Sequence, residues 1–137
     1  MCGIVGLFGR ENAVGLVLAG MKIIEYRGKE GYGLYSNAKV KYSDKIDFEN
    51  TSDNFAIGHC LHSVVNKVKQ PFLGNGVFAV NCEIYNWKEL AEKYKLNPTN
   101  DAELFFFLVE KFGVKETLNL VEGDYAGVYY KENKIYL

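Results

Sequence analysis

The sequence predicts one layered domain that combines α-helices with β-strands. A chain of 137 residues suits a single domain and leaves little room for two. Apolar residues make up 48% of the chain and charged residues 24%, close to the averages for globular proteins, so a hydrophobic core of ordinary size is expected. The predicted elements run in the order strand, helix, strands, helices and hairpin, which is typical of a layered α/β or α+β fold.

The N-terminal half predicts one helix among several strands. Val14, Val17 and Met21 recur at helical spacing, so an amphipathic helix is expected from Asn12 to Glu25. The polar stretch 39–53 favours no particular element. Short apolar runs predict strands over residues 1–8, 31–35 and 55–59, with a turn at 27–31.

The C-terminal half predicts a buried strand, helices and a closing hairpin. Val77 to Cys82 is apolar without alternation, as expected for a strand buried on both faces. Asn86 and Asn100 are each followed three residues later by a glutamate, a pattern that caps helix N-termini. The other predicted features are a helix end near residue 94, an apolar helical stretch at 104–109 whose Phe cluster (105–107) packs in the core, a short helix over 115–121, and a hairpin of 125–130 and 134–137 turning at 132–133.

Composition excludes several classes of function. The formal net charge of −1 offers no electrostatic basis for binding nucleic acid or an anionic membrane. No apolar run approaches the roughly 20 residues of a membrane helix, and no secretory signal opens the chain, so a cytoplasmic location is expected. The three cysteines, Cys2, Cys60 and Cys82, are widely spaced, which argues against a disulfide framework and against a zinc site. No metal site is predicted.

Cys2 directly follows Met1, and this position has chemical consequences. Removal of the initiator methionine would leave a thiol and a free α-amine on one residue. The α-amine titrates near pH 7.7–8.0 and a free thiol near pH 8.5, so the amine can accept the thiol proton near neutral pH. A nucleophile and its base would then share one residue. By position alone, the alternative is a small buried apolar side chain at a chain start.

Six segments, in order, resemble the class II glutamine amidotransferases, whose glutaminase domains are N-terminal nucleophile hydrolases. Residues 83–86 (E-I-Y-N) and 120–126 (compare L-x-G-x-F-A) favour the asparagine synthetase branch of this family. The implied fold is α+β, a four-layer αββα sandwich. The segments are 1–8 (M-C-G-I-V-G-L-F), 26–33 (compare H-R-G-P-D-x-x-G), 58–65 (compare G-H-x-R-L-S-I-V), 70–71 (Q-P), 79–86 (compare A-V-N-G-E-I-Y-N) and 100–103 (compare S-D-x-E).

The resemblance implies a role for particular residues. Cys2 is the implied nucleophile, and the Asn81 side-chain amide and the backbone N–H of Cys82 are the implied donors to the oxyanion. Glutamine is a zwitterion, so its site needs anionic groups at the amine and cationic or N–H groups at the carboxylate. The implied substrate-binding residues are Arg27, which also supports the nucleophile loop, Leu61, His62, Val64, and Glu83 and Asp101, which hold the α-ammonium group.

Other readings compete for several of these residues. Without the resemblance, Glu83 and Asp101 are ordinary carboxylates at a strand end and a helix start. His59 is expected to be a hydrogen-bonded core histidine, because the nucleophile already has its base. Asn86 is expected to act chiefly as a helix cap.

Three positions depart from the family pattern. Leu61 replaces the Arg that, in the family, binds the substrate carboxylate, which is expected to weaken the free energy of substrate binding by roughly 1.5–3 kcal/mol. His62, Lys67 or Lys69 would have to compensate for this loss. Cys82 replaces the oxyanion glycine, so a Cβ is expected to crowd the hole and a positive φ would cost energy. Lys29-Glu30 replaces Pro-Asp, a milder change.

The family's domain normally continues beyond the last segment seen here, so the chain is expected to be an incomplete domain or part of a larger enzyme. The implied reaction hydrolyses L-glutamine and supplies ammonia to an asparagine-synthetase-like domain or subunit, with ATP and Mg belonging to that part and no cofactor for glutamine hydrolysis. A homo-oligomer is compatible with this reading. The alternatives are a catalytically degenerate structural or regulatory module, motivated by Leu61 and Cys82, and an amidohydrolase for another amide.

Overall fold

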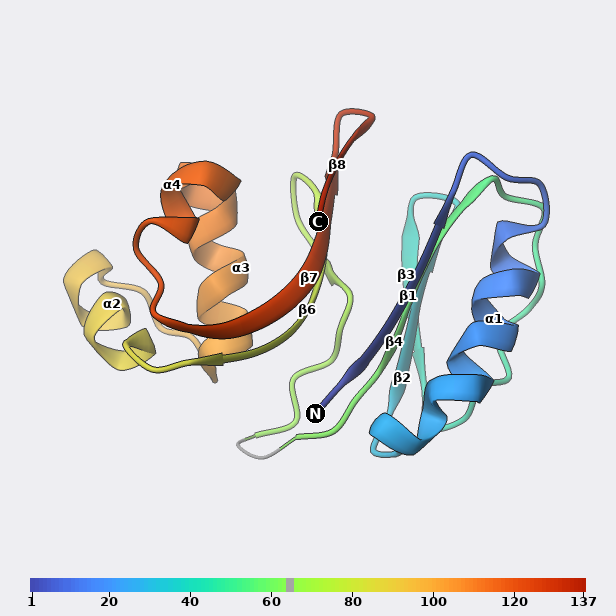
Figure 1. Ribbon diagram of the computed structural model, residues 1–137, viewed down its shortest axis with the longest axis horizontal. Helices are drawn as coiled ribbons and strands as arrows, with labels where there is room; N and C mark the ends of the chain where they lie inside the picture. Colours follow the sequence, from blue (N-terminus) through green and yellow to red (C-terminus); the bar gives the residue numbers. More distant parts are fainter. Residues whose placement is uncertain (64–65) are drawn as a thin grey trace.

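A computed structural model of the chain describes residues 1–63 and 66–137 and shows four layers (Figure 1). Two antiparallel sheets face each other, and helices cover the outer face of each, so the predicted α+β, αββα arrangement is confirmed. The first sheet has the order β1-β4-β2-β3, with β1 (Gly3–Phe8), β2 (Tyr32–Ser36), β3 (Lys39–Ser43) and β4 (Phe55–Cys60). The second has the order β5-β6-β7-β8, with β5 (Phe72–Leu73), β6 (Val77–Ile84), β7 (Gly123–Lys131) and β8 (Lys134–Tyr136).

The outer face of the first sheet is covered by α1 (Ala13–Ile24), which continues into a 3-10 turn, η1 (Glu25–Arg27). The apolar spacing in the sequence predicts this helix, and its buried face includes Val14, Val17 and Met21 as expected. Gly58 on β4 lets the helix approach closely, because a Cβ there would collide with Met21 and Val17. Predicted turn residue Arg27 lies at the end of η1 instead of in a loop.

The two sheets bury a shared apolar layer between them. Ile57 of β4 and Val77, Ala79 and Val128 of the second sheet lie fully or almost fully buried there. The Phe55 ring bridges the sheets, with its centroid 4.6 Å from that of Phe8 and 4.2 Å from that of Tyr130. β6 contributes side chains to this layer and to the helical side, so the prediction of a strand buried on both faces is confirmed.

The outer face of the second sheet is covered by α2 (Trp87–Tyr94), α3 (Asp101–Phe112) and α4 (Val114–Leu118). Leu104, Phe105 and Leu108 of α3 are buried in this core, and Phe105 meets Phe78 edge to face. The predicted packing role of the Phe cluster is therefore confirmed for Phe105. The short helix ends at Leu118 and not at Val121 as expected.

The two predicted helix caps have different outcomes. Asn100 Oδ1 accepts a hydrogen bond from Glu103 N at 2.9 Å, so this cap is confirmed, although the Glu103 carboxylate accepts from Thr99 N instead of closing the reciprocal bond. Asn86 makes no side-chain cap to α2, so its predicted role is wrong. Its amide donates to Leu120 O (2.9 Å) and accepts from Glu122 N (3.0 Å), tying the start of α2 to the segment before β7.

His59 is fully buried on β4, as expected, and its ring faces the backbone of Val80, but neither imidazole nitrogen meets the geometry of a normal hydrogen bond with a described residue. Burial lowers the pKa of His59 to about 3, so the imidazole stays neutral in the folded protein. The side chain therefore packs as an apolar group that the unfolded chain would protonate.

This pKa difference predicts an acid-sensitive fold. The unfolded His59 takes up a proton below about pH 6.5, whereas the folded one does so only near pH 3, so the stability present above pH 6.5 is lost as the pH falls. The expected loss is about 2 kcal/mol in total, measured as the free energy of urea unfolding between about pH 7.5 and pH 5, because one group contributes at most about 1.4 kcal/mol per pH unit. The His59→Gln variant cannot titrate there and should show a flatter profile; equal slopes in the two proteins would contradict the prediction.

Candidate active site

Cys2 stands where the two sheets meet. It precedes β1 of the first sheet, and the chain's N-terminus lies between the sheets (Figure 1). An open cleft of about 500 Å³ is lined by Cys2, by Arg27 from η1 and by Asn81 from β6, with Gly127 and Val128 of β7 on one side. Segments far apart in the sequence therefore converge on the thiol.

Three segments hold the Cys2 residue. Its backbone N donates to Asn81 Oδ1 at 2.7 Å, and its carbonyl accepts from Arg27 Nε at 3.1 Å. The thiol sulfur lies 3.4 Å from His62 O and 3.5 Å from His62 N. The structure thus brings together four of the residues singled out in the sequence: Cys2, Arg27, His62 and Asn81.

Burial affects the chemistry of the thiol. It raises the pKa of Cys2, and the backbone hydrogen bond with His62 acts in the opposite direction. A thiol with a raised pKa yields its proton less readily, so it depends more on a nearby base. The Cys2 nitrogen, now a peptide nitrogen behind Met1, would become an amine at that place once Met1 is removed.

Asn81, which contacts Cys2, and the backbone of Cys82 each carry an N–H donor. The hydrogen bond from Cys2 N fixes the oxygen end of the Asn81 amide and leaves its Nδ2 directed elsewhere. Backbone N–H groups alternate sides along an antiparallel strand. Val80 N donates to Gln70 Oε1 (2.7 Å) and Ile84 N to Asp101 Oδ2 (3.0 Å), both away from β7, so Cys82 N–H points to this same open side.

Cys82 fits its position without strain. Its φ is not among the positive values, so the expected cost of a left-handed backbone does not arise. Its sulfur turns toward the helical layer, 3.8 Å from Asp101 Oδ2, and burial together with that carboxylate raises the thiol pKa. The side chain of Cys82 therefore leads away from Asn81, because neighbouring residues of a strand project to opposite faces.

The two carboxylates predicted to hold an ammonium group differ in placement. Asp101 opens α3 and is anchored by Ile84 N and, through Oδ1, by Ala102 N at 3.0 Å. Glu83 is exposed on β6 opposite Asp124. Strand alternation puts the Glu83 side chain on the face opposite Cys82, whereas Asp101 contacts Cys82. The side chains of Glu83 and Asp101 therefore lie on opposite faces of β6.

Leu61 is buried and lies beside a second, smaller cleft of about 220 Å³, with Tyr32 and Lys67 among its lining residues. Its backbone is fixed to the 30–31 turn, since Leu61 N donates to Gly31 O at 2.8 Å and its carbonyl accepts from Glu30 N at 3.0 Å. Its side chain is not among those lining the cleft at Cys2. Val64, also predicted to bind substrate, lies outside the described residues.

The Glu30 carboxylate contacts two of the residues that were considered as replacements for the missing arginine, an arrangement that the sequence did not predict. Its carboxylate accepts from Ser63 Oγ at 2.8 Å and lies 3.3 Å from His62 Nδ1 and 3.9 Å from Lys67 Nζ. The Ser63 hydrogen bond is the main reason that the pKa of Glu30 is lowered. Lys69 instead lies over the Tyr42 ring, 5.6 Å from its centroid. His62, whose backbone contacts the Cys2 sulfur, and Lys67 are therefore both held at Glu30.

Gln70 is a second residue whose contacts sequence reasoning missed. Its side chain is buried and accepts a hydrogen bond from Val80 N on β6, the strand that carries Asn81 and Cys82. The Q-P pair marks the position in the sequence, but only the structure reveals this contact.

Residues 1–63 and 66–137 contain no group of three or more His, Cys, Asp or Glu side chains arranged to hold a metal ion. Of the helices described, none combines the length and apolarity required to cross a membrane.

Comparison with known proteins identifies the family. The profile described as "Glutamine amidotransferase domain" matches residues 1–137. A glutamine–fructose-6-phosphate aminotransferase (isomerizing) of Lactiplantibacillus plantarum is 32% identical over 142 residues, covering 87% of this chain and 24% of its own length. A putative glutamine-hydrolysing asparagine synthetase of Methanocaldococcus jannaschii is 29% identical, covering 98% of this chain and 27% of its own length. The chain thus spans about a quarter of the length of these curated relatives.

A solved structure supports the fold assignment. Glutamine phosphoribosylpyrophosphate amidotransferase from B. subtilis, in complex with ADP and GMP, superposes with a TM-score of 0.77 at 20% identity, covering 96% of this chain and 35% of that one. The profile match, the two curated relatives and the shared fold agree. The chain therefore belongs to the class II glutamine amidotransferases, a family of enzymes, as the motifs in its sequence predict.

Proposed function

We propose that the chain hydrolyses L-glutamine to glutamate and ammonia, with Cys2 as the nucleophile after removal of Met1. The observation that carries the proposal is the 2.7 Å hydrogen bond from Cys2 N to Asn81 Oδ1. It joins the nucleophilic residue directly to an oxyanion donor on the other sheet. After removal of Met1, this bond would orient the α-amine of Cys2, which shares its residue with the thiol that it must deprotonate.

The proposed reaction proceeds in two halves. The α-amine of Cys2 takes the thiol proton, and the sulfur attacks the side-chain amide carbon of glutamine. Asn81 Nδ2 and Cys82 N–H stabilise the oxyanion. Collapse breaks the C–N bond, the ammonium group of Cys2 returns the proton to the leaving nitrogen, and a thioester remains. Water, deprotonated by the same amine, then attacks the thioester carbon. The C–S bond breaks, the ammonium group returns its proton to the Cys2 sulfur, and glutamate is released.

Asp101 is the better placed of the two predicted ligands for the substrate ammonium group. Its carboxylate is held by two backbone N–H groups and keeps further acceptor sites. At the substrate carboxylate, His62 is the favoured replacement for the missing arginine, because its backbone contacts the Cys2 sulfur and its ring is oriented by Glu30.

The ammonia would be used by a partner domain or subunit that activates an acceptor. An asparagine-synthetase-like partner that uses ATP and Mg is the proposed destination, based on the E-I-Y-N run and the asparagine synthetase relative. The aminotransferase relatives make a sugar phosphate the competing acceptor. The cytoplasmic location remains a prediction from the sequence.

A glutamine-mimicking electrophile such as a diazoketone analogue of glutamine tests the proposal. We expect one covalent adduct, located on Cys2 by peptide mass analysis, in protein lacking Met1, and we expect free glutamine to block its formation. Ammonia release should be fastest with glutamine in a panel that includes asparagine and simple primary amides.

Leu61 favours a second candidate, an amidohydrolase for an amide without an α-carboxylate. Turnover of simple amides but not of glutamine would support that candidate. A thiol that is neither labelled nor active would support a degenerate module and overturn the proposal.

A further inference from the structure

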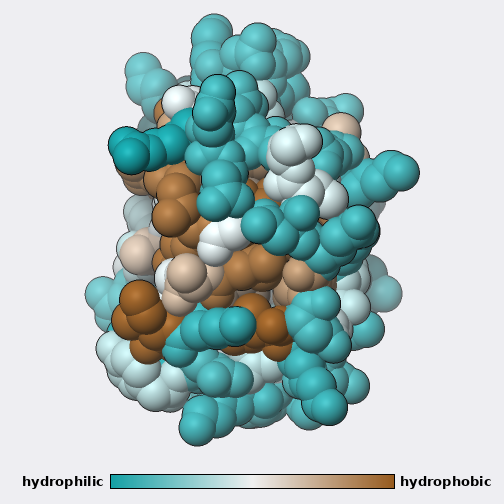
Figure 2. Space-filling view, turned by 90° about the vertical axis from the view of Figure 1, so that its right-hand side faces the viewer, coloured by the Kyte–Doolittle hydropathy of each residue, from teal (hydrophilic) through white to brown (hydrophobic). Residues whose placement is uncertain are grey.

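The outer face of α1 is apolar and uncovered. Leu16, Ile23 and Tyr26 are 47%, 75% and 74% exposed, and Ala19 between them is exposed as well. Figure 2 looks onto the side of the molecule that α1 forms in Figure 1 and shows a broad hydrophobic band across it. Lys22 is the one charged residue in the twelve of this helix. The core of the domain is already closed on the other face of α1, so these side chains are not needed for folding.

The spacing of the exposed residues indicates what kind of partner fits. Leu16, Ala19 and Ile23 of α1 follow one another at steps of three and four residues, and Asn12 at the N-cap and Tyr26 in η1 extend this pattern beyond the two ends of the helix. Such steps form the narrow seam by which one helix packs along another in a coiled coil. The complementary surface is therefore another helix lying nearly parallel or antiparallel to α1.

The middle of this seam reads the same in both directions. A small residue, Ala19, stands at the centre, and an aliphatic side chain, Leu16 or Ile23, stands on either side. An antiparallel copy would set Leu16 against Ile23 of the other chain, Ala19 against Ala19, and Tyr26 near Asn12. A surface that matches itself after a two-fold rotation is the requirement for an isologous dimer.

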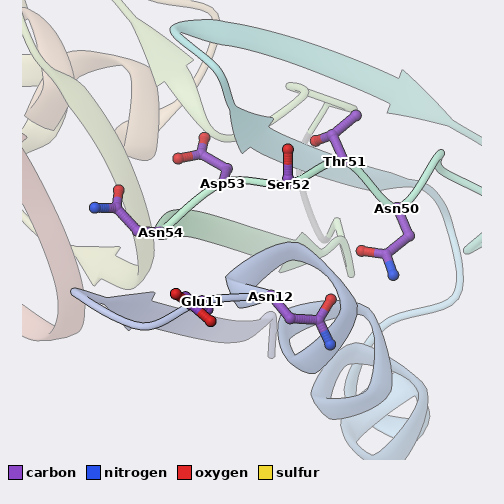
Figure 3. Close-up of a pocket in the computed structure, with 7 residues that line it drawn as sticks. All are labelled: Glu11, Asn12, Asn50, Thr51, Ser52, Asp53 and Asn54. Carbon is purple, nitrogen blue, oxygen red and sulfur yellow. The ribbon is translucent and has the colours of Figure 1, made fainter.

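The two ends of α1 also complement each other in charge. A cleft of about 600 Å³ lies at its N-terminal end, lined by carboxylates, amides and hydroxyls of Glu11, Asn12 and residues 50–54 (Figure 3). The exposed cations Lys22, in the last turn of α1, and Lys29, five residues beyond the helix, flank the exposed Tyr26 in the sequence. Reversing one helix brings this cationic end to the carboxylate-bearing cleft of the other copy.

From these observations we infer that the chain forms a two-fold dimer through α1. The helices pack antiparallel along the seam, and Tyr26 of each copy enters the cleft at the N-terminal end of α1 in the other. One helix face is smaller than the roughly 800 Å² per partner of a standard interface, so the dimer is weak and depends on concentration. The inference does not rest on the proposed function, because no catalytic residue takes part.

Sedimentation velocity of the full chain over a concentration series tests the dimer. A shift from monomer to dimer is expected at tens of micromolar, and Ile23→Glu should raise the dissociation constant by at least about tenfold because it buries a charge in the seam. Leu118→Glu is the matched control, since Leu118 is also helical and 41% exposed but lies on α4, and it should dimerise like wild type. A chain that stays monomeric throughout the series, or a dimer unaffected by Ile23→Glu, would overturn the inference.

A cross-link tests the antiparallel geometry separately. Ala19→Cys places two thiols together at the two-fold axis, so mild oxidation should give a dimer joined at position 19, identified by peptide mass analysis. Leu118→Cys and wild type, under the same oxidation, should stay unlinked. A dimer in sedimentation that fails to cross-link through position 19 would show that another surface joins the copies.

Discussion

Replacing Cys2 by alanine is expected to abolish glutamine hydrolysis, with a fall in kcat of roughly 10⁴-fold or more. The substitution removes the sulfur that forms the thioester but keeps the residue whose nitrogen and carbonyl bond to Asn81 and Arg27. The fold should therefore remain, with an unchanged melting temperature. Ammonia release, measured beside the intact mass of each protein, checks the result and shows whether Met1 has been removed.

Cys2→Ser provides the closest control, because it keeps a nucleophile of similar size with a much less acidic group. We expect it to retain the fold with low residual activity, well below that of wild type. Two results would contradict an N-terminal nucleophile: activity that survives in Cys2→Ala, or full activity of wild-type protein that still carries Met1.

Replacing Asn81 by alanine is expected to lower kcat by about 10²–10³-fold while changing KM much less. Its Nδ2 would act on the charge that develops on the substrate oxygen, and not on the bound amide in its ground state. The loss also frees the Cys2 nitrogen from its 2.7 Å hydrogen bond, which adds to the fall in rate. Steady-state ammonia release over a range of glutamine concentrations separates kcat from KM.

Asn75→Ala is a suitable control for that experiment, since Asn75 is exposed in the turn before β6, far from the thiol in sequence and absent from its cleft. It should match wild type in both constants. An Asn81→Ala effect confined to KM would show that Asn81 binds the substrate and is not an oxyanion donor.

Local sequence patterns predicted the elements that local forces determine. The apolar spacing of Val14, Val17 and Met21 sets α1, and Glu132 and Asn133 take the positive φ values (51° and 60°) that a two-residue hairpin turn requires. Elements defined by distant partners were missed. β5 has two residues and exists through its pairing with β6, and β3 is an exposed edge strand with a polar sequence.

The same distinction applies to the candidate site. Motifs placed Cys2, Arg27, Asn81 and Asp101 in the sequence, and the structure brings all four to one end of the sheets. The motifs could not predict the direction in which each side chain points. Asn86 turned to Leu120 and Glu122, which lie 34 and 36 residues away, and the pleat of β6 separated Glu83 from Asp101. Such choices depend on which backbone groups a distant segment leaves without partners.

The proposed nucleophile and its proposed oxyanion donors lie on different sheets, so the proposed chemistry depends on how the sheets pack together. Cys2 precedes β1 of the sheet covered by α1, whereas Asn81 and Cys82 lie on β6 of the sheet covered by α2, α3 and α4. The backbone ladders within each sheet do not fix their mutual distance; the apolar contacts of Phe55, Ile57 and Val128 between the sheets do so. Side-chain packing in that middle layer thus sets the alignment of Cys2 with Asn81, and a shift of one sheet relative to the other would abolish the proposed activity while both sheets stayed intact.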